Sequence, residues 1–218
     1  MRVLTWNLFH GRSVPETPRS LLREFAEALA GWSWDVALLQ EVPPWWPPEL
    51  GRAARASARS ALTSRNLGLP ARRALAARRP DLLKSNGGGA NAILVRGPAI
   101  VEHRVETLRW WPERRIVHAV RADGLPWLGN VHAQVHSEAR AQADLATAAG
   151  ALARWASSGA AVLGGDFNTR APVVPGFELA GGAGVDWVAV RDLRPAGASQ
   201  VLDRAALSDH APVAVTVR

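Results

Sequence analysis

Short apolar runs separated by polar turns recur along the whole chain, a pattern typical of β-strands in packed sheets. The runs that predict strands are Arg2–Leu8, Val36–Leu39, Ala92–Val95, Ile116–Arg121, Trp127–Val135, Ala160–Leu163, Val185–Val190 and Pro212–Val217. Asp123-Gly124 stands between two of these runs, and this dipeptide is typical of a tight hairpin turn.

Two longer segments carry apolar residues at helical spacing instead. Pro18–Leu29 has Leu21, Phe25 and Leu29 on one predicted face, and Glu138–Ala156 is the second such segment. Many short strands with few helices predict an α+β fold in which two sheets pack face to face with helices outside. The length of 218 residues suits a single domain spanning residues 1–218.

Three stretches between the predicted strands have distinctive compositions. Val42–Pro48, with the sequence VPPWWPP, predicts an extended loop because proline disfavours helix in the residue before it. Residues 51–65 are rich in alanine and predict a helix, and Gly87-Gly88-Gly89 predicts a break.

Composition narrows the class of protein further. At 48% hydrophobic and 21% charged residues the chain can form a sizeable core, and the absence of cysteine excludes disulfides, cysteine-bound zinc and a thiol nucleophile. No apolar run approaches the ~18 residues of a membrane span, and the N-terminal residues resemble a strand more than a secretion signal. We therefore expect a cytoplasmic protein, whose oligomeric state the sequence does not indicate.

Positive charge is concentrated in one segment. The chain carries a formal net charge of +7, and residues 52–84 contain nine basic residues and one acidic residue, Asp81. Such a cluster can bind a polyanion or can be an ordinary solvated face, and the sequence leaves both open. If the segment is helical, Arg52, Arg55 and Arg59 share one face and could contact a nucleic-acid backbone.

Polar residues that could support catalysis recur where the predicted strands end. They are Asn7, Gln40, Glu41, His132, Asp166, Asn168, Asp186, Ser208, Asp209 and His210. Side chains at strand ends can converge on one edge of a sandwich, where loops leave room for a substrate. Carboxylate ligands without cysteine or a closely spaced histidine pair favour Mg²⁺, or Mn²⁺, over zinc.

These residues belong to several short motifs that follow one another in a fixed order. Together the motifs are a stronger sign of function than any one of the residues alone. They are TWN at 5–7, LLQE at 38–41, NVHA at 130–133, GGDFN at 164–168, VDWV at 185–188 and SDH at 208–210. In sequence and order they resemble the endonuclease/exonuclease/phosphatase family, and they extend over nearly the whole chain. The resemblance implies a four-layer α/β sandwich with two mixed sheets and a metal-dependent phosphoesterase activity.

The resemblance also implies a role for each matched residue. Glu41 is similar to the principal metal carboxylate of the family, with Asn7 beside it and Asp209 as a further ligand. Asp166 resembles the carboxylate that orients or deprotonates the attacking water, and Asn168 resembles the amide that holds the phosphate. His210 resembles the histidine beside the scissile phosphate, and Asp186 resembles the carboxylate that fixes its tautomer.

His132, in the NVHA motif, resembles a histidine found only in some branches of the family. Where it occurs, a glutamate just before a strand can pair with it, whereas here the corresponding stretch has Gly89 or Asn91. We therefore expect His132 to bind phosphate more than to act as a strong general acid.

Fold and motifs together predict the reaction but not the substrate. The basic segment favours a nuclease acting on DNA or RNA with Mg²⁺. A phospholipid headgroup or a small phosphate ester is the alternative substrate, and VPPWWPP is the predicted lipid-facing loop. A catalytically inactive binding module is the lesser alternative, which the intact set of motifs disfavours.

Overall fold

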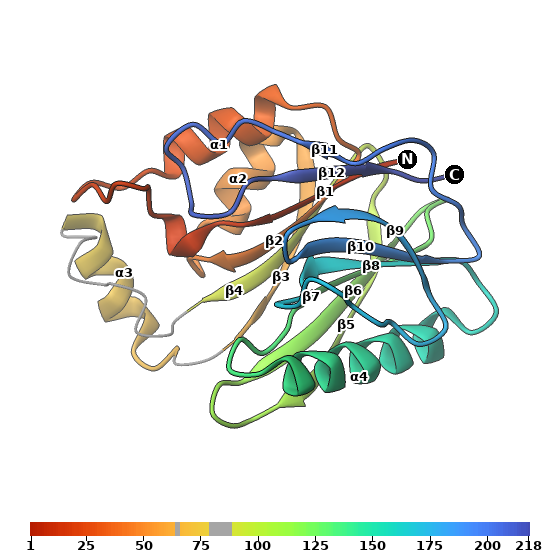
Figure 1. The fold of residues 1–218 in the computed structure, drawn as a ribbon. Helices are drawn as coiled ribbons and strands as arrows, with labels where there is room; N and C mark the ends of the chain where they lie inside the picture. The colour runs from red at the N-terminus through yellow and green to blue at the C-terminus, as the bar shows by residue number, and fades with distance from the viewer. Residues whose placement is uncertain (64–65, 79–88) are drawn as a thin grey trace.

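The computed structural model describes residues 1–63, 66–78 and 89–218, and in these ranges two mixed β-sheets pack against each other (Figure 1). The first sheet has the order β11 (Gln200–Val201), β12 (Val213–Thr216), β1 (Arg2–Asn7), β2 (Val36–Val42), β4 (Ala90–Arg96) and β3 (Ala56–Leu62). The second has the order β5 (Ile100–Arg109), β6 (Arg115–Ala122), β7 (Trp127–His132), β8 (Ala161–Asp166), β10 (Asp186–Arg191) and β9 (Glu178–Ala183).

Helices cover the outer faces of the two sheets. The helices are α1 (Leu22–Gly31), α2 (Pro47–Ala54), α3 (Leu69–Arg78) and α4 (Glu138–Ala156), and a short 3₁₀ turn, η1, spans Phe9–Gly11. In Figure 1, α1 and α2 lie above the first sheet and α4 lies below the second. The result is the predicted four-layer arrangement of helix, sheet, sheet and helix, and the predicted fold class is confirmed.

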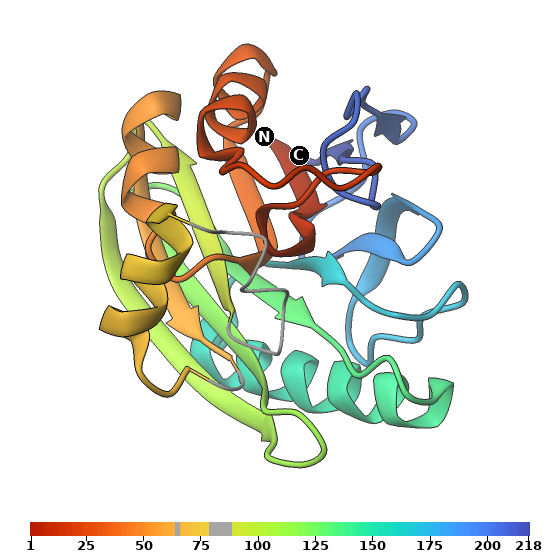
Figure 2. The same cartoon turned by 90° about the vertical axis from the view of Figure 1, so that its left-hand side faces the viewer.

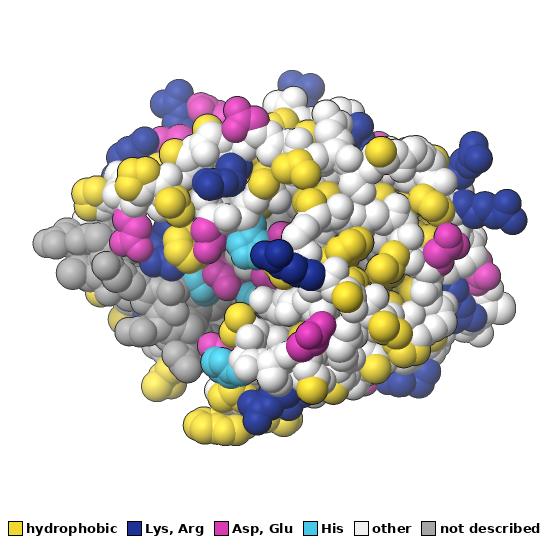
Figure 3. All heavy atoms as spheres, in the orientation of Figure 1, with side chains coloured by type: hydrophobic (Ala, Val, Ile, Leu, Met, Phe, Trp, Pro, Cys, Tyr) yellow, Lys and Arg dark blue, Asp and Glu magenta, His cyan; other side chains and the backbone are white. Residues whose placement is uncertain are grey.

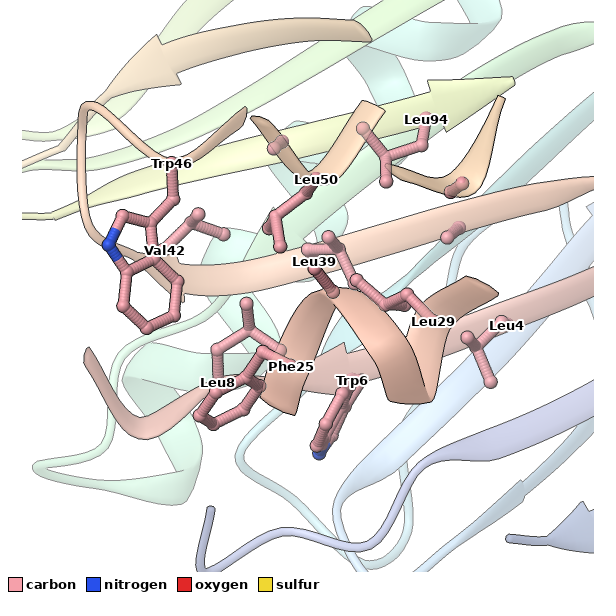
Figure 4. Packing of buried hydrophobic residues seen from close by; sticks show 14 of the residues in the cluster. Leu4, Trp6, Leu8, Phe25, Leu29, Leu39, Val42, Trp46, Leu50 and Leu94 are labelled. Atoms are coloured by element: carbon pink, nitrogen blue, oxygen red, sulfur yellow. The ribbon is translucent and has the colours of Figure 1, made fainter. Parts of the chain in front are cut away.

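Apolar side chains fill each of the spaces between these layers. Between the sheets, Val36 and Leu38 of β2 pack in a cluster with Leu128, Val162 and residues of β12. Under α1 and α2, a second cluster forms around the fully buried Trp6 and Phe25, whose ring centroids are 5.0 Å apart (Figure 4). This packing fixes the central strands, whose ends carry the polar motifs.

The segments with the strongest patterns fold as predicted. Helix α4 has the predicted bounds, and its N-cap Ser137 accepts a hydrogen bond from the backbone N–H of Arg140. The turn at Asp123-Gly124 joins the antiparallel strands β6 and β7, with Gly124 at φ +71°. The first predicted helix begins later than expected, at Leu22.

The prediction of a helix over residues 51–65 is correct only as far as Ala54, and residues 64–65 lie outside the described ranges. Helix α2 ends at Ala54, and β3 then pairs antiparallel with β4 from Ala56 to Leu62. The high helix propensity of alanine is a weak preference, which the hydrogen-bonding edge of β4 overrides. Small residues also suit the packing, since a Cβ at Gly51 would lie 3.0 Å from the carbonyl oxygen of Ala56.

The extended loop predicted at Val42–Pro48 is also wrong in part. Strand β2 continues to Val42, and α2 begins at Pro47, because proline is favoured in the first turn of a helix, where its missing N–H costs nothing. Trp46 is 5% exposed and packs on Phe25 with a centroid distance of 5.5 Å. Trp46 therefore belongs to the core, and this segment is not an exposed hydrophobic loop.

Several elements lacked a clear sequence signal. Strands β3, β5, β9 and β11 and helix α3 were not predicted. Part of the basic segment, including Arg65, Arg79 and Lys84, and the predicted break at Gly87-Gly88 lie outside the described residues. Within the described ranges, no helix is long and apolar enough to cross a membrane.

Candidate active site at the ends of the central strands

The central strands of both sheets end at one edge of the sandwich, and Figure 2 looks onto this edge. In the second sheet, Asp166 at the end of β8 is the register partner of both His132 on β7 and Asp186 on β10. In the first sheet, β1 and β2 run parallel, with Asn7 opposite Gln40. Figure 3 shows histidine and acidic side chains gathered in a hollow on this side of the molecule.

Glu41 reaches the site through an irregularity in β2. The pairing of β2 with β4 shifts register between Leu39 and Val42, and Glu41 has φ +49°. Such a bulge adds one residue to a strand and turns a side chain out of the regular alternation. The Glu41 side chain is thereby 21% exposed between otherwise buried neighbours.

Asp166 lies at the centre of a hydrogen-bonded group. Its Oδ2 accepts a hydrogen bond of 3.0 Å from the Asn7 side-chain amide, and its Oδ1 accepts one of 3.0 Å from the backbone N–H of Asn168. The Asn168 side chain donates to the Ala133 carbonyl at 2.9 Å. These bonds fix the Asp166 carboxylate, which is only 1% exposed, next to both histidines of the site.

His210 is held by its ring and by its backbone. Its Nδ1 lies 2.8 Å from Asp186 Oδ2, so the other ring nitrogen, Nε2, faces Asp166 Oδ2 at 3.8 Å. The Trp6 indole donates to the His210 carbonyl at 3.0 Å, and the Ser208 hydroxyl donates to the Asn7 carbonyl at 2.6 Å. The SDH loop is thereby anchored to β1, and Trp6 supports the site as well as the core.

The resemblance implies that a glutamate just before a strand can pair with His132, but its acidic neighbours in the structure are Asp166 and Glu41. Its Nε2 lies 3.5 Å from Asp166 Oδ2 and 3.9 Å from Glu41 Oε1. Asn91 is buried in β4, and neither atom of its amide has a partner among the described residues. Burial, and after it the charge of Arg115, hold the pKa of His132 well below its usual value, so the ring is neutral.

His10 belongs to the same group, although its sequence context gave no sign of it. Its Nε2 lies 2.9 Å from Glu41 Oε2. The residue sits in η1 with φ +53° and ψ +28°, a left-handed conformation that turns the ring back towards β2. The local sequence, Phe-His-Gly, lacks a histidine-ligand spacing, and only the glycine at position 11 indicates a turn.

Left-handed backbone conformations are concentrated in the loops of this site. Non-glycine residues with positive φ include Phe9, His10, Glu41, Asn168 and Ser208. Each such residue costs on the order of 1–3 kcal/mol, which the surrounding packing must offset. Strained residues of this kind are typical of sites where side-chain direction matters more than local stability.

The pKa values of several groups in the site differ strongly from those of the same groups in water. Burial raises the pKa of Glu41, but the hydrogen bond and charge of His10 outweigh burial and hold it well below its usual value. Burial and the charge of Asp186 raise the pKa of Asp166 to about 6. Burial lowers the pKa of His210, but Asp186 and then Asp166 outweigh it and raise that pKa to about 9. At neutral pH a protonated His210 therefore faces a carboxylate that can accept a proton.

The donor atoms present fit a divalent cation. Asp166, Asp186 and His210 each offer a ligand atom within 4.8 Å of the others, and the buried Oδ1 of Asp186 has no partner among the described residues. Glu41 offers a third carboxylate, which is ionised. Burial raises the pKa of Asp186, and the charge of the exposed Asp209 adds to this shift. Carboxylate oxygens with imidazole nitrogens are common ligands for such ions.

The three arginines predicted to share a helix face do not share one. Arg52 is on α2 and pairs with Glu49, Arg55 is the left-handed C-cap of that helix, and Arg59 is on β3. All three are exposed. The predicted common face is wrong because the helix ends before Arg55.

Two six-stranded sheets with buried carboxylates and histidines at one edge define a phosphoesterase-type α/β sandwich. The model of the endonuclease/exonuclease/phosphatase family matches residues 4–210, so the chain belongs to this family, whose members hydrolyse phosphoester bonds. A search of curated proteins found no match.

Solved structures with the same fold cover the whole of this chain. An endonuclease/exonuclease/phosphatase from Beutenbergia cavernae has a TM-score of 0.73 at 18% identity, with 71% of that chain covered. A mannosyl-6-phosphatase from Bacteroides thetaiotaomicron has a TM-score of 0.70 at 16% identity, with 99% of its chain covered. TDP2 from Caenorhabditis elegans has a TM-score of 0.65 at 16% identity, with 74% of its chain covered.

Proposed function

We propose that the protein is a Mg²⁺- or Mn²⁺-dependent phosphodiesterase that cleaves DNA or RNA. The observation that carries the proposed reaction is the pairing of His210 with Asp186 at 2.8 Å while its other ring nitrogen faces Asp166 at 3.8 Å. A protonated imidazole and a carboxylate whose pKa is raised to about 6 then lie next to each other.

In the proposed reaction, Asp166 accepts a proton from a water molecule as the water oxygen attacks phosphorus. The bond from phosphorus to the leaving oxygen breaks, and that oxygen takes up a proton from solvent water on release. His210, kept in one tautomer by Asp186, donates a hydrogen bond to the phosphate, whose negative charge grows in the transition state. Asn168 and His132 are the proposed further phosphate contacts.

Glu41 is the proposed principal ligand of the cation, with Asn7 and Asp209 as further ligands. A bound divalent cation neutralises charge on the phosphate oxygens. The Asn7 amide oxygen accepts one hydrogen bond of 2.9 Å from the Phe9 N–H, which leaves its second lone pair for a cation. The Glu41 carboxylate suits the principal position because it is ionised and partly exposed.

Charge supports nucleic acid as the substrate. The chain has a formal net charge of +7, and Arg52, Arg55 and Arg59 are exposed, although they do not form one row and Arg52 pairs with Glu49. Basic residues of this kind supply the part of nucleic-acid affinity that does not depend on sequence. A cytoplasmic location remains our prediction.

A phospholipid is the second candidate substrate, and one observation favours it. Trp110 and Trp111 are 73% and 81% exposed on the turn between β5 and β6. Tryptophans are enriched at membrane–water interfaces, so this exposed pair favours a lipid substrate. The lipid-facing segment predicted from VPPWWPP is not available for this role, because Trp46 is buried.

A substrate panel tests the proposal. Supercoiled plasmid, single-stranded DNA, RNA, sphingomyelin, mannose phosphate and bis-p-nitrophenyl phosphate are each incubated with Mg²⁺, Mn²⁺ or EDTA. We expect cleavage of nucleic acid that EDTA abolishes. Turnover of sphingomyelin or of the sugar phosphate alone would contradict the nuclease assignment and leave the phosphoesterase assignment intact.

A further inference from the structure

Both oxygens of the Glu41 carboxylate have an imidazole nearby. His10 Nε2 lies 2.9 Å from Oε2, and His132 Nε2 lies 3.9 Å from Oε1. The two rings come from different sheets, His10 from the turn after β1 and His132 from the end of β7. The carboxylate is therefore placed in a mixed nitrogen and oxygen environment.

The His10 ring is directed at Glu41 by backbone and packing. Its other nitrogen, Nδ1, is buried and has no hydrogen-bond partner within the described ranges. The turn itself is fixed by Gly11, because a Cβ there would lie 2.3 Å from the Trp46 ring. Gly89 borders the imidazole, since a Cβ at that position would make an ordinary van der Waals contact of 3.4 Å with its Cε1. The position of Nε2 is thus a consequence of three separate segments.

The spacing of the two donor atoms suits a shared cation. Two ligands in adjacent positions of an octahedral ion, with bonds of about 2.1 Å, are about 3 Å apart. The observed separation of Nε2 and Oε2 is 2.9 Å. A hydrogen bond between His10 and Glu41 would give a similar distance. The experiment must therefore distinguish a His10 that binds the cation from a His10 that only orients Glu41.

Imidazole nitrogen changes which ion such a site prefers. Mg²⁺ favours oxygen ligands, whereas first-row transition metals accept imidazole readily. We propose that His10 is a nitrogen ligand of the cation held by Glu41, and that it makes the site favour Mn²⁺ over Mg²⁺. The proposal rests on the metal-dependent function proposed above and adds a ligand that the family motifs did not indicate.

The test is metal binding measured without turnover. Calorimetry gives the affinities of the wild-type protein and of His10→Gln for Mn²⁺ and Mg²⁺, and pulsed electron paramagnetic resonance of bound Mn²⁺ detects a directly bound imidazole nitrogen. We expect His10→Gln to weaken Mn²⁺ binding by about tenfold or more and Mg²⁺ binding by less than about threefold. The nitrogen coupling should diminish in the same variant.

Two further variants make the comparison specific. His136→Gln removes an exposed imidazole elsewhere and should change neither affinity nor coupling. His132 also lies near Glu41, so the His10→Gln substitution is repeated in a His132→Gln background. We expect the nitrogen coupling to be present in the His132→Gln variant and to be lost when His10→Gln is added. If His10→Gln does not fold, His10→Asn replaces it, because asparagine tolerates the left-handed conformation better than most residues.

The outcomes separate the two proposals. Unchanged nitrogen coupling, or an equal loss of affinity for both ions, would mean that His10 only orients Glu41 and would overturn this inference alone. A wild-type protein that binds neither ion would overturn the metal-dependent function as well.

Discussion

The hydrogen bond between Asp186 and His210 occupies one ring nitrogen and directs the other towards Asp166. Asp166 itself is held by Asn7 and by the backbone of Asn168. A phosphate hydrogen-bonded to His210 Nε2 and a water molecule hydrogen-bonded to Asp166 Oδ2 would lie side by side, because these two atoms are 3.8 Å apart. The two residues should therefore act on the same transition state.

Substitutions at these two residues should not combine multiplicatively. His210→Ala and Asp166→Asn should each lower turnover by on the order of 10³-fold or more, because each removes a group that acts only in the transition state. The double variant should be little slower than either single one. Steady-state kinetics of all four proteins checks this, and losses that multiply would contradict a shared role.

His132 should contribute less than His210. It is neutral and lies beside two carboxylates, Asp166 and Glu41, so it can position a phosphate but is a weak proton donor. His132→Ala should lower turnover by roughly 10²-fold, within the range for a positioned polar group. The rate is measured per folded molecule, with the melting temperature as the control. A loss as large as that for His210→Ala would contradict this ranking.

Most of the candidate site could be predicted from individual residues, because strand-end motifs keep their chemistry in a short stretch of sequence. Asn7, Glu41, Asp166, Asp186 and His210 meet at one edge because each follows or begins a central strand. His10 could not be predicted in this way. Its contact with Glu41 depends on a left-handed turn and on the register of β1 against β2, and neither is visible in local spacing.

At the scale of elements, buried strands and the amphipathic helix α4 were predicted and edge elements were not. Strand β3 is made of small and basic residues and pairs only with β4, so its sequence lacks the apolar alternation of a half-buried strand. Strand β5 is likewise at an edge, and most of its residues are half-buried. Both are strands because a neighbouring strand supplies hydrogen bonds, which depends on the tertiary fold.

The pairing of β7 with β8 should depend on Gly165. This residue has φ +146°, and a Cβ would lie 1.8 Å from the Val131 carbonyl oxygen, so any side chain must push the strands apart. Gly165→Ala should destabilise the protein by about 2–4 kcal/mol and reduce turnover, because Asp166 follows directly.

Gly31→Ala is the matched control. Gly31 is the last residue of α1, and its added Cβ would meet nothing within 4 Å. Urea unfolding should show a neutral or slightly stabilising effect for this variant. Equal effects of the two substitutions would show that close approach at Gly165 does not limit stability.

Across the whole molecule, a line of polar side chains crosses the interior between the sheets. His118 is fully buried, with Nδ1 3.2 Å from His103 Nε2 and Nε2 3.4 Å from the Asn130 amide nitrogen. Asn130 in turn accepts a hydrogen bond of 2.8 Å from Gln40 of the first sheet. Burial, and after it the charge of His103, lower the pKa of His118 to about 3.

The buried His118 should make folding sensitive to acid. A histidine with a pKa near 6.5 when unfolded and about 3 when folded binds fewer protons in the folded state. Its contribution to stability is therefore complete above pH 6.5 and is lost as the pH falls towards 3, by at most about 1.4 kcal/mol per pH unit.

Urea unfolding of the wild-type protein and of His118→Gln over this pH range checks the sign. The variant should be less stable at neutral pH, and the difference between the two proteins should shrink as the pH falls. Since other titrating groups are common to both proteins, they cancel in this comparison. A difference that does not change with pH would mean that His118 does not titrate on unfolding.

Metal-dependent phosphoester hydrolysis at Glu41 is the central function proposed for the protein. The most direct measurement is the turnover of bis-p-nitrophenyl phosphate by the wild-type protein and by Glu41→Gln, each with Mg²⁺, Mn²⁺ or EDTA. We predict hydrolysis by the wild-type protein with either metal, none with EDTA, and a loss of about 10³-fold or more in a folded Glu41→Gln variant. Hydrolysis that persists in EDTA, or that Glu41→Gln leaves unchanged, would contradict the account.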